Sequence, residues 1–251
     1  MTWILPESQR VPSPNFWAGR NGVPIDVLVL HYAVDGDDFE RGENELAPFQ
    51  ATQPSHDAHD VARLFSRKSR GASAHFAIGR DGSQAQLVSL ADTAHHAGGG
   101  AFPDKGTGPL RRPRPGRMNR RSVGVELCNA GWAVDKIGVP ADRRRVAAHP
   151  ATPRRRREWE VYTDAQLDTL EHVVALSLPH FSTDHPLFAT GHEDVVNRDT
   201  LSAKAGKKVF GGKVDPGPLF PWGRFAPFLR RLGITPVRYD FKTRAWVERD
   251  E

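Results

Sequence analysis

Residues 190–222 read TGHEDVVNRDTLSAKAGKKVFGGKVDPGPLFPW, and the rest of the fold is expected to be organised around this stretch. His192 follows a short apolar run, residues 186–189, which is typical of a buried strand, so its side chain is expected at the exit of that strand. Asp215 stands in a DPGP turn, whose proline and glycine hold the carboxylate on a rigid loop. A catalytic zinc ion usually takes three protein ligands of this kind, so a third ligand is expected elsewhere in the chain.

The third candidate ligand is His31, near the end of IDVLVLHYA, residues 25–33. The apolar run before it is rich in leucine and β-branched residues and predicts a strand buried on both faces. His31 and His192 would then share the C-terminal edge of an α/β sheet, where such sheets bind ligands. Either histidine alone is better explained as a hydrogen-bonded structural residue, but the two histidines and Asp215 together favour a metal site.

Six motifs follow one another between residues 25 and 230. They are His31 after its apolar strand, SAHFAIGRDG at 73–82, AHHAGG at 94–99, SVGVELCN at 122–129, GHEDV at 191–195 and KVDPGPLFPW at 213–222. This series resembles the zinc-dependent N-acetylmuramoyl-L-alanine amidases, a family that includes bacterial muropeptide-recycling amidases, phage lysozyme-type amidases and peptidoglycan recognition proteins. The resemblance implies one Zn²⁺ per chain, peptidoglycan or muropeptides as partners, and hydrolysis of the bond between N-acetylmuramic acid and L-alanine.

Glu126 is the candidate proton shuttle. It lies inside the apolar run Val123–Leu127, where a carboxylate is costly unless it faces a polar cleft. Burial would raise its pKa toward the working range of a general base, and its match to the catalytic glutamate of the resembled family adds to this interpretation.

Lys213 is the second candidate catalytic residue. In an extended segment its side chain would point the same way as that of Asp215, so its ammonium could help to stabilise an oxyanion beside the metal. The alternative is a solvated lysine in a basic loop. The resemblance also implies substrate-binding roles for His96 and Asn129, and His96 could equally be structural.

Composition agrees with a single α/β enzyme domain. A chain of 251 residues can bury about three quarters of its unfolded surface in one core. With 38% hydrophobic residues, 23 glycines and 20 prolines, we expect long ordered loops around a central mixed sheet flanked by helices. We expect an N-terminal arm at 1–24, the catalytic domain at 25–232 and an extension at 233–251 that forms a small C-terminal hairpin.

Four further elements can be predicted from periodicity and turn chemistry. Residues 54–70 read as a helix with Ser55 as its N-cap, and residues 75–90 as a hairpin turning at Asp81-Gly82. Residues 163–181 form the clearest helix, with a Thr163–Gln166 capping box. A last helix is expected from Trp222 to Leu232, in which Pro227 should either shift the start or bend the helix.

Two arginine-rich runs, six arginines in 111–121 and seven in 143–157, are expected to be loops near the cleft. With a net charge of +5 they could attract the protein to anionic cell-envelope polymers, or they could serve solubility alone. The runs carry no interleaved aromatic residues, and the usual nucleic-acid-binding folds are not recognisable, so nucleic acid is not the expected partner.

Location and redox state can also be anticipated. No apolar stretch reaches the roughly 20 residues that span a bilayer, and the first 20 residues lack a signal-peptide core. We therefore expect synthesis in the cytoplasm without membrane insertion, and action on the cell wall after release if the protein is an endolysin. Cys128, the single cysteine, is expected to be a buried thiol.

The expected function is that of a zinc amidase, with a phage or prophage endolysin favoured over a cytoplasmic amidase that recycles anhydro-muropeptides. A non-catalytic peptidoglycan-binding protein is less favoured, because all three ligand positions and both catalytic positions are filled. A basic nucleic-acid-binding protein or metallonuclease is the least favoured alternative.

Overall fold

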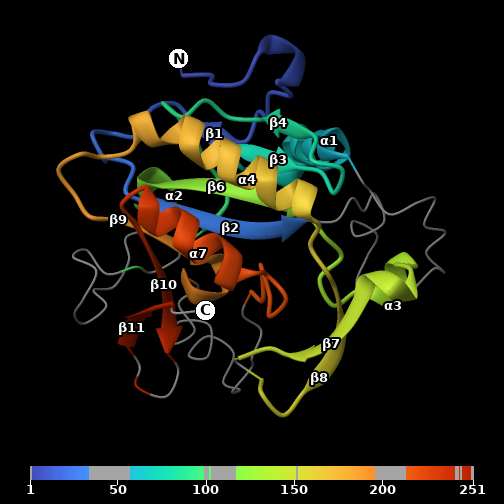
Figure 1. The fold of residues 1–251 in the computed structure, drawn as a ribbon. Helices are drawn as coiled ribbons and strands as arrows, with labels where there is room; N and C mark the ends of the chain where they lie inside the picture. The colour runs from blue at the N-terminus through green and yellow to red at the C-terminus, as the bar shows by residue number, and fades with distance from the viewer. Residues whose placement is uncertain are drawn as a thin grey trace, which may run out of the picture.

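The computed structural model describes residues 2–33, 57–98, 102, 117–150, 152–195, 213–240, 243 and 245–249. Within them a seven-stranded sheet has the order β11-β10-β9-β2-β6-β3-β4 (Figure 1). Its strands are β2 (Val27–Ala33), β3 (Phe76–Ile78), β4 (Gln84–Gln86), β6 (Ser122–Cys128), β9 (Leu187–Gly191), β10 (Ile234–Asp240) and β11 (Ala245–Glu248). Strands β10 to β3 run parallel, and antiparallel β11 and β4 form the two edges. The predicted central mixed sheet is confirmed.

Helices and two short ribbons surround this sheet. The ribbons pair β1 (Phe16–Trp17) with β5 (Thr93–Ala94), and β7 (Arg144–Ala148) with β8 (Arg156–Glu160). The helices are α1 (Ala58–Phe65), α2 (Arg117–Arg121), α3 (Val134–Ile137), α4 (Asp164–Ser177), α5 (His192–Val195) and α7 (Trp222–Arg231). Within the described ranges, no helix combines the length and the apolar character that a membrane span requires.

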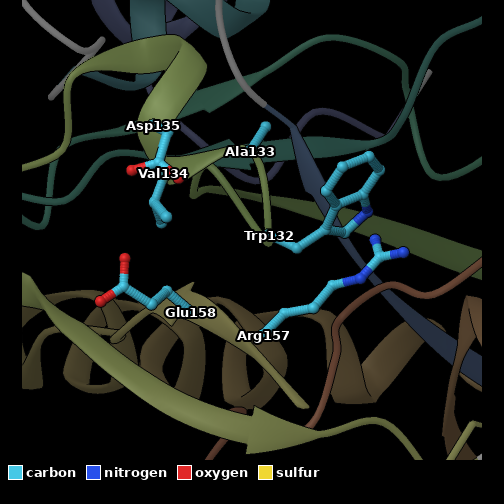
Figure 2. Close-up of a pocket in the computed structure, with 6 residues that line it drawn as sticks. All are labelled: Trp132, Ala133, Val134, Asp135, Arg157 and Glu158. Carbon is cyan, nitrogen blue, oxygen red and sulfur yellow. The ribbon is translucent and has the colours of Figure 1, made fainter. Parts of the chain in front are cut away.

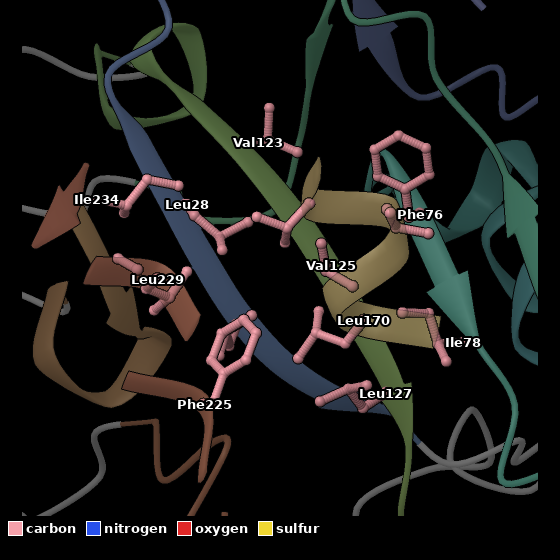
Figure 3. Close-up of a cluster of buried hydrophobic side chains, with 14 of the residues drawn as sticks. Leu28, Phe76, Ile78, Val123, Val125, Leu127, Leu170, Phe225, Leu229 and Ile234 are labelled. Atoms are coloured by element: carbon pink, nitrogen blue, oxygen red, sulfur yellow. The ribbon is translucent and has the colours of Figure 1, made fainter. Parts of the chain in front are cut away.

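Side chains alternate along each strand, so one face of the sheet carries the apolar core and the other carries polar site residues. Val123, Val125 and Leu127 of β6 point to the face covered by α4 and α7, where they join the largest buried apolar cluster (Figures 1 and 3). Residues between them in β6, including Glu126, therefore point to the opposite face. His31 is the register partner of Glu126 on β2, so both polar side chains lie on that opposite face.

Helix α4 confirms the predicted capping box. Thr163 accepts a hydrogen bond from the backbone N–H of Gln166, and the Gln166 side chain accepts one from the backbone N–H of Thr163. Such a cap contributes about 1 kcal/mol. The α-helix ends at Ser177, and residues up to His180 form a 3-10 turn. Pro179 explains the change, since proline has no backbone N–H to continue the α-helical ladder.

Helix α1 is shorter than predicted and has a different cap. Its N-cap is Asp57, whose carboxylate accepts a hydrogen bond from the backbone N–H of His59. The predicted cap Ser55 is therefore wrong for this helix, and that residue lies outside the described residues. The hairpin predicted for residues 75–90 is present as antiparallel β3 and β4, and the last helix is present as α7 with Pro227 inside it.

The prediction of a loop for residues 143–157, the second arginine-rich run, is corrected in part. Residues 144–148 are strand β7, and residues 156 and 157 begin strand β8, which pairs antiparallel with β7. Arg154 and Arg155 lie in the connection between the two strands. Arg144 ion-pairs with Glu158 across the ribbon and with Asp135 of α3, while Trp159 is buried and its indole N–H donates to the Ala147 carbonyl. Interstrand pairing and one buried aromatic ring thus order a segment whose composition resembles a loop. Of the first run, residues 117–121 are helix α2, and residues 111–116 lie outside the described part.

The two ends of the chain both pack on the sheet. In the N-terminal arm, Leu5 is buried in the main core and Gln86 of β4 accepts hydrogen bonds from the backbone N–H groups of Ile4 and Leu5. At the other end, the expected C-terminal hairpin is present as β10 and β11. Strand β10 pairs parallel with β9, so this hairpin extends the central sheet.

Candidate metal centre

His31 reaches the site from the middle of the sheet. It is the fifth residue of β2, is 2% exposed, and lies beside Glu126 of the parallel strand β6. Residues paired in this way place their side chains on the same face of a sheet. A buried apolar strand therefore delivers an imidazole to a fixed position next to a carboxyl group.

His192 and Asp215 come from the next parallel strand and from the turn that folds over it. Strand β9 ends at Gly191, and His192 is the first residue of α5. A Cβ atom at Gly191 would lie 2.6 Å from Cδ of Pro216, so only glycine lets the turn approach this closely. The backbone N–H of Glu193 donates to the Asp215 carbonyl at 2.9 Å, which joins helix α5 to the turn.

The three predicted ligands meet in a triangle of donor atoms. His31 Nδ1 lies 2.9 Å from His192 Nδ1 and 3.1 Å from Asp215 Oδ2, and His192 Nδ1 lies 2.9 Å from the same oxygen. All three residues are buried. The donor atoms of a tetrahedral zinc with bonds of about 2.0 Å are about 3.3 Å apart, so this two-nitrogen, one-oxygen set fits zinc in chemistry and in size.

The protonation of the cluster also suits a cation. The pKa of His31 is lowered to about 4, chiefly by burial and next by neighbouring His192, against the opposing effect of Asp215, so the imidazole is neutral near pH 7. Burial alone would raise the pKa of Asp215, but His192 and His31 hold it below its ordinary value. A neutral imidazole and an ionised carboxylate are the forms that bind metals.

His96 extends the site behind His31. Its Nδ1 lies 3.0 Å from His31 Nε2, and its Nε2 lies 3.0 Å from the Ser122 hydroxyl, which donates its only proton to the Met118 carbonyl. Because the hydroxyl proton is used, His96 Nε2–H must donate to Ser122, and His96 Nδ1 must accept from His31 Nε2–H. His31 Nδ1 therefore carries a lone pair toward the triangle. The ring of His96 packs directly on Gly124, where a Cβ atom would lie 2.5 Å from it.

Glu126 is buried, with 7% of its surface exposed. Its pKa is raised to about 8, chiefly by burial and next by the Asp215 carboxylate, against the opposing charges of Lys213 and Arg70. The raised pKa that the sequence predicted is thus present. A carboxyl group of this pKa can both accept and return a proton near neutral pH.

Lys213 is exposed and acts on this cluster through its charge. Its ammonium lowers the pKa of both Glu126 and His31, so it lies within electrostatic range of the two groups. The catalytic role of Lys213 stays a prediction at this point.

Asn129 is buried just beyond β6, and its amide is used inside the protein. Its Oδ1 accepts from the backbone N–H of Gly131 at 2.8 Å, and its Nδ2 donates to the Glu160 carbonyl at 3.3 Å. Both ring nitrogens of His96 likewise face protein atoms. Substrate contacts by these two residues remain predictions.

Several residues around the site had no clear sequence signal. The Tyr162 hydroxyl donates to the Pro216 carbonyl at 2.8 Å and so holds the turn that carries Asp215. Tyr32 follows His31, and burial together with Asp215 and Glu193 raises the pKa of its phenol. Arg249 pairs with both carboxylates of α5. Only the side-by-side acids of GHED hinted that a cation would be needed there.

A separate pocket of about 350 Å³ lies between α3 and β8 (Figure 2). Trp132, which is 41% exposed, forms one wall with the guanidinium of Arg157 4.6 Å above its ring. Asp135 and Glu158 lie on the other side, and the ligand triangle does not line this pocket.

The sequence profile of the N-acetylmuramoyl-L-alanine amidase family matches residues 21–218. The chain belongs to this family. Membership of this family supports peptidoglycan amidase activity. The matched range includes all three residues of the donor triangle. No protein with a curated description matches the chain.

Solved structures similar to this amidase-family chain have low overall superposition scores. A selenomethionine derivative of AmpD is 26% identical, with 90% of this chain and 96% of that chain covered and a TM-score of 0.47. AmpDh3 from Pseudomonas aeruginosa is 22% identical, covering 97% and 70%, with a TM-score of 0.46. The endolysin amidase LysCS from Clostridium intestinale is 16% identical, covering 90% and 95%, with a TM-score of 0.41.

Proposed function

We propose that this chain hydrolyses the amide bond between N-acetylmuramic acid and L-alanine in peptidoglycan, with one zinc ion held by His31, His192 and Asp215. The observation that carries the proposal is the buried triangle of two imidazole nitrogens and a carboxylate oxygen, with the Glu126 carboxyl on the neighbouring strand. A catalytic zinc typically has three protein ligands and keeps its fourth position for water or substrate.

When bound, zinc polarises the amide carbonyl and lowers the pKa of water to about 7. Glu126 accepts the proton of the attacking water and passes it to the departing amine, which cannot leave as an anion. Its buried position and raised pKa support this role. Lys213 brings a second positive charge toward the oxyanion of the tetrahedral intermediate, and its electrostatic effect on Glu126 and His31 supports that placement.

The favoured setting is the crosslinked wall, as for a phage or prophage endolysin. Exposed arginines of the β7–β8 ribbon, among them Arg145 and Arg156, support attraction to an anionic wall polymer. The alternative setting is the recycling of soluble anhydro-muropeptides by the same chemistry. A non-catalytic binding protein is disfavoured because the ligand triangle is complete and Glu126 lies beside it.

Product analysis on two substrates tests the proposal. Intact sacculi and soluble anhydro-muropeptides are digested in parallel, and both should yield peptides with a free L-alanine amino group. Faster release from sacculi would support the endolysin role, and faster release from anhydro-muropeptides would support recycling. New reducing sugar ends without such peptides would mean a glycosidase and would overturn the proposed reaction.

A further inference from the structure

The C-terminal hairpin lies beyond residue 218, where the family match ends, yet it packs beside the strand that presents His192. Strand β10 is the direct parallel neighbour of β9, and Ile234 of β10 belongs to the main buried cluster. Arg249 follows β11, and its backbone N–H donates to the Pro236 carbonyl of β10 at 2.9 Å. This part of the chain is thus in contact with the metal-binding edge of the sheet.

Helix α5 places two buried carboxylates directly after the ligand His192. Glu193 and Asp194 are 6% and 8% exposed. Buried carboxylates are retained only with hydrogen-bonding or ionic partners. Asp194 accepts from the backbone N–H of Tyr239 at 3.1 Å, and its Oδ2 lies 3.3 Å from the Thr190 hydroxyl and 2.6 Å from Arg249 Nη2.

Arg249 is the cation shared by both acids. Its Nη2 is 3.4 Å from Glu193 Oε1 as well as 2.6 Å from Asp194 Oδ2. The guanidinium is itself buried and stacks 4.2 Å from the ring centre of Trp222. His149 Nε2 meets the other oxygen of Glu193 at 2.6 Å. The planar guanidinium of Arg249 thus stacks on Trp222 and binds the two carboxylates of α5 from one side.

The helix that Arg249 holds connects two of the three ligands. His192 is its first residue, and the backbone N–H of Glu193, its second residue, donates to the Asp215 carbonyl. A shift of Glu193 and Asp194 would therefore change the spacing between His192 Nδ1 and Asp215 Oδ2. Groups behind metal ligands typically change metal affinity by about 10- to 100-fold when they are removed.

We propose that Arg249 is a positioning residue for the metal site, so that the C-terminal hairpin is an integral part of the zinc centre and not an appendage. The inference rests on the zinc ion of the proposed function. Arg249, which lies outside the range matched by the family, would then be needed to set the geometry of His192 and Asp215.

Zinc titration of variants in the full-length chain tests this inference. Arg249→Met is compared with Arg238→Met, which removes an exposed arginine from β10 of the same hairpin. Zinc affinity is measured by competition with a chromophoric chelator, and thermal unfolding of the metal-free protein is measured in parallel. Arg249→Met should bind zinc about 10- to 100-fold more weakly, and Arg238→Met should bind it as the wild type does. Cobalt substitution should also give an altered visible spectrum in Arg249→Met only.

A second variant covers the case in which Arg249→Met does not fold. Arg249→Lys keeps a cation but lacks the planar fork that reaches both carboxylates, so it should fold and still lose zinc affinity. Wild-type zinc affinity and an unchanged cobalt spectrum in a folded Arg249 variant, even one with lowered thermal stability, would overturn the inference. Wild-type protein that binds no zinc would instead overturn the proposed function.

Discussion

Glu126 shows how one residue obtains its chemistry from its position in a strand. The flanking valine and leucine side chains enter the core, while the carboxyl group is buried on the opposite face beside His31. Glu126→Gln should keep zinc and the fold and lower the turnover number by roughly 10²- to 10⁴-fold, because the shape is kept and the base is lost. Elemental analysis and rate measurement check this together. Loss of zinc from the variant would show that the carboxylate is a ligand or a structural group.

A catalytic role of Lys213 can be distinguished from that of an ordinary surface lysine by comparing two variants. If its ammonium stabilises the oxyanion, Lys213→Ala should lose roughly a hundredfold in kcat with little change in KM. Lys68→Ala, which removes another exposed lysine, should change neither constant. Equal and small losses in the two variants would return Lys213 to the solvated surface.

His96 should act on the metal through His31. Removing its acceptor nitrogen leaves His31 Nε2–H without its partner, so His96→Phe should weaken zinc binding by about 10- to 100-fold. His95→Phe changes the neighbouring histidine, which contacts Trp17, and is the matched control. Chelator competition measures both. Equal zinc affinities in the two variants would contradict the hydrogen-bond chain from Met118 to His31.

The β7–β8 ribbon is the element that composition alone described wrongly. The exposed arginines of this ribbon and of the connection between its strands should contribute to wall binding through charge, which salt screens over about 10 Å at 0.1 M. Replacing Arg154, Arg155 and Arg156 with glutamine should weaken cosedimentation with sacculi at low salt and remove most of its salt dependence. The control carries the same charge change at the exposed residues Arg63, Arg231 and Arg238. Equal loss in both triple variants would mean that only net charge matters.

Other elements could be predicted where a local pattern is sufficient to determine them. The capping box of α4 and the apolar runs of β2 and β6 each have a strong periodic or turn signal, and the structure contains them. The end of α4 was misplaced because continuing apolar periodicity hid the effect of Pro179. The predicted cap of α1 is wrong because Ser55 and Asp57 are both residue types that cap helices well, so composition does not distinguish them.

Across the molecule, the residues that meet in the metal site can be predicted from the sequence, but the long-range contacts that hold them in place cannot. His31, His192 and Asp215 could be predicted because strand ends and a rigid turn bring ligands to one edge of a parallel sheet. The alternation in residues 237–241 predicts a strand but does not identify its partner, so the place of β10 beside β9 could not be foreseen. The pairing of Arg249 with α5 depends on that placement, since the adjacent acids of GHED indicate that a cation is needed but not which residue supplies it.

We propose that a zinc ion on His31, His192 and Asp215 makes this chain a peptidoglycan amidase. The most direct test measures zinc content and the release of L-alanine-terminated peptides from sacculi on one preparation, before and after chelation and after zinc is restored. We predict one zinc per chain, loss of activity with the metal, and recovery when zinc returns. Full activity in excess chelator, or an active preparation without zinc, would contradict zinc-dependent catalysis.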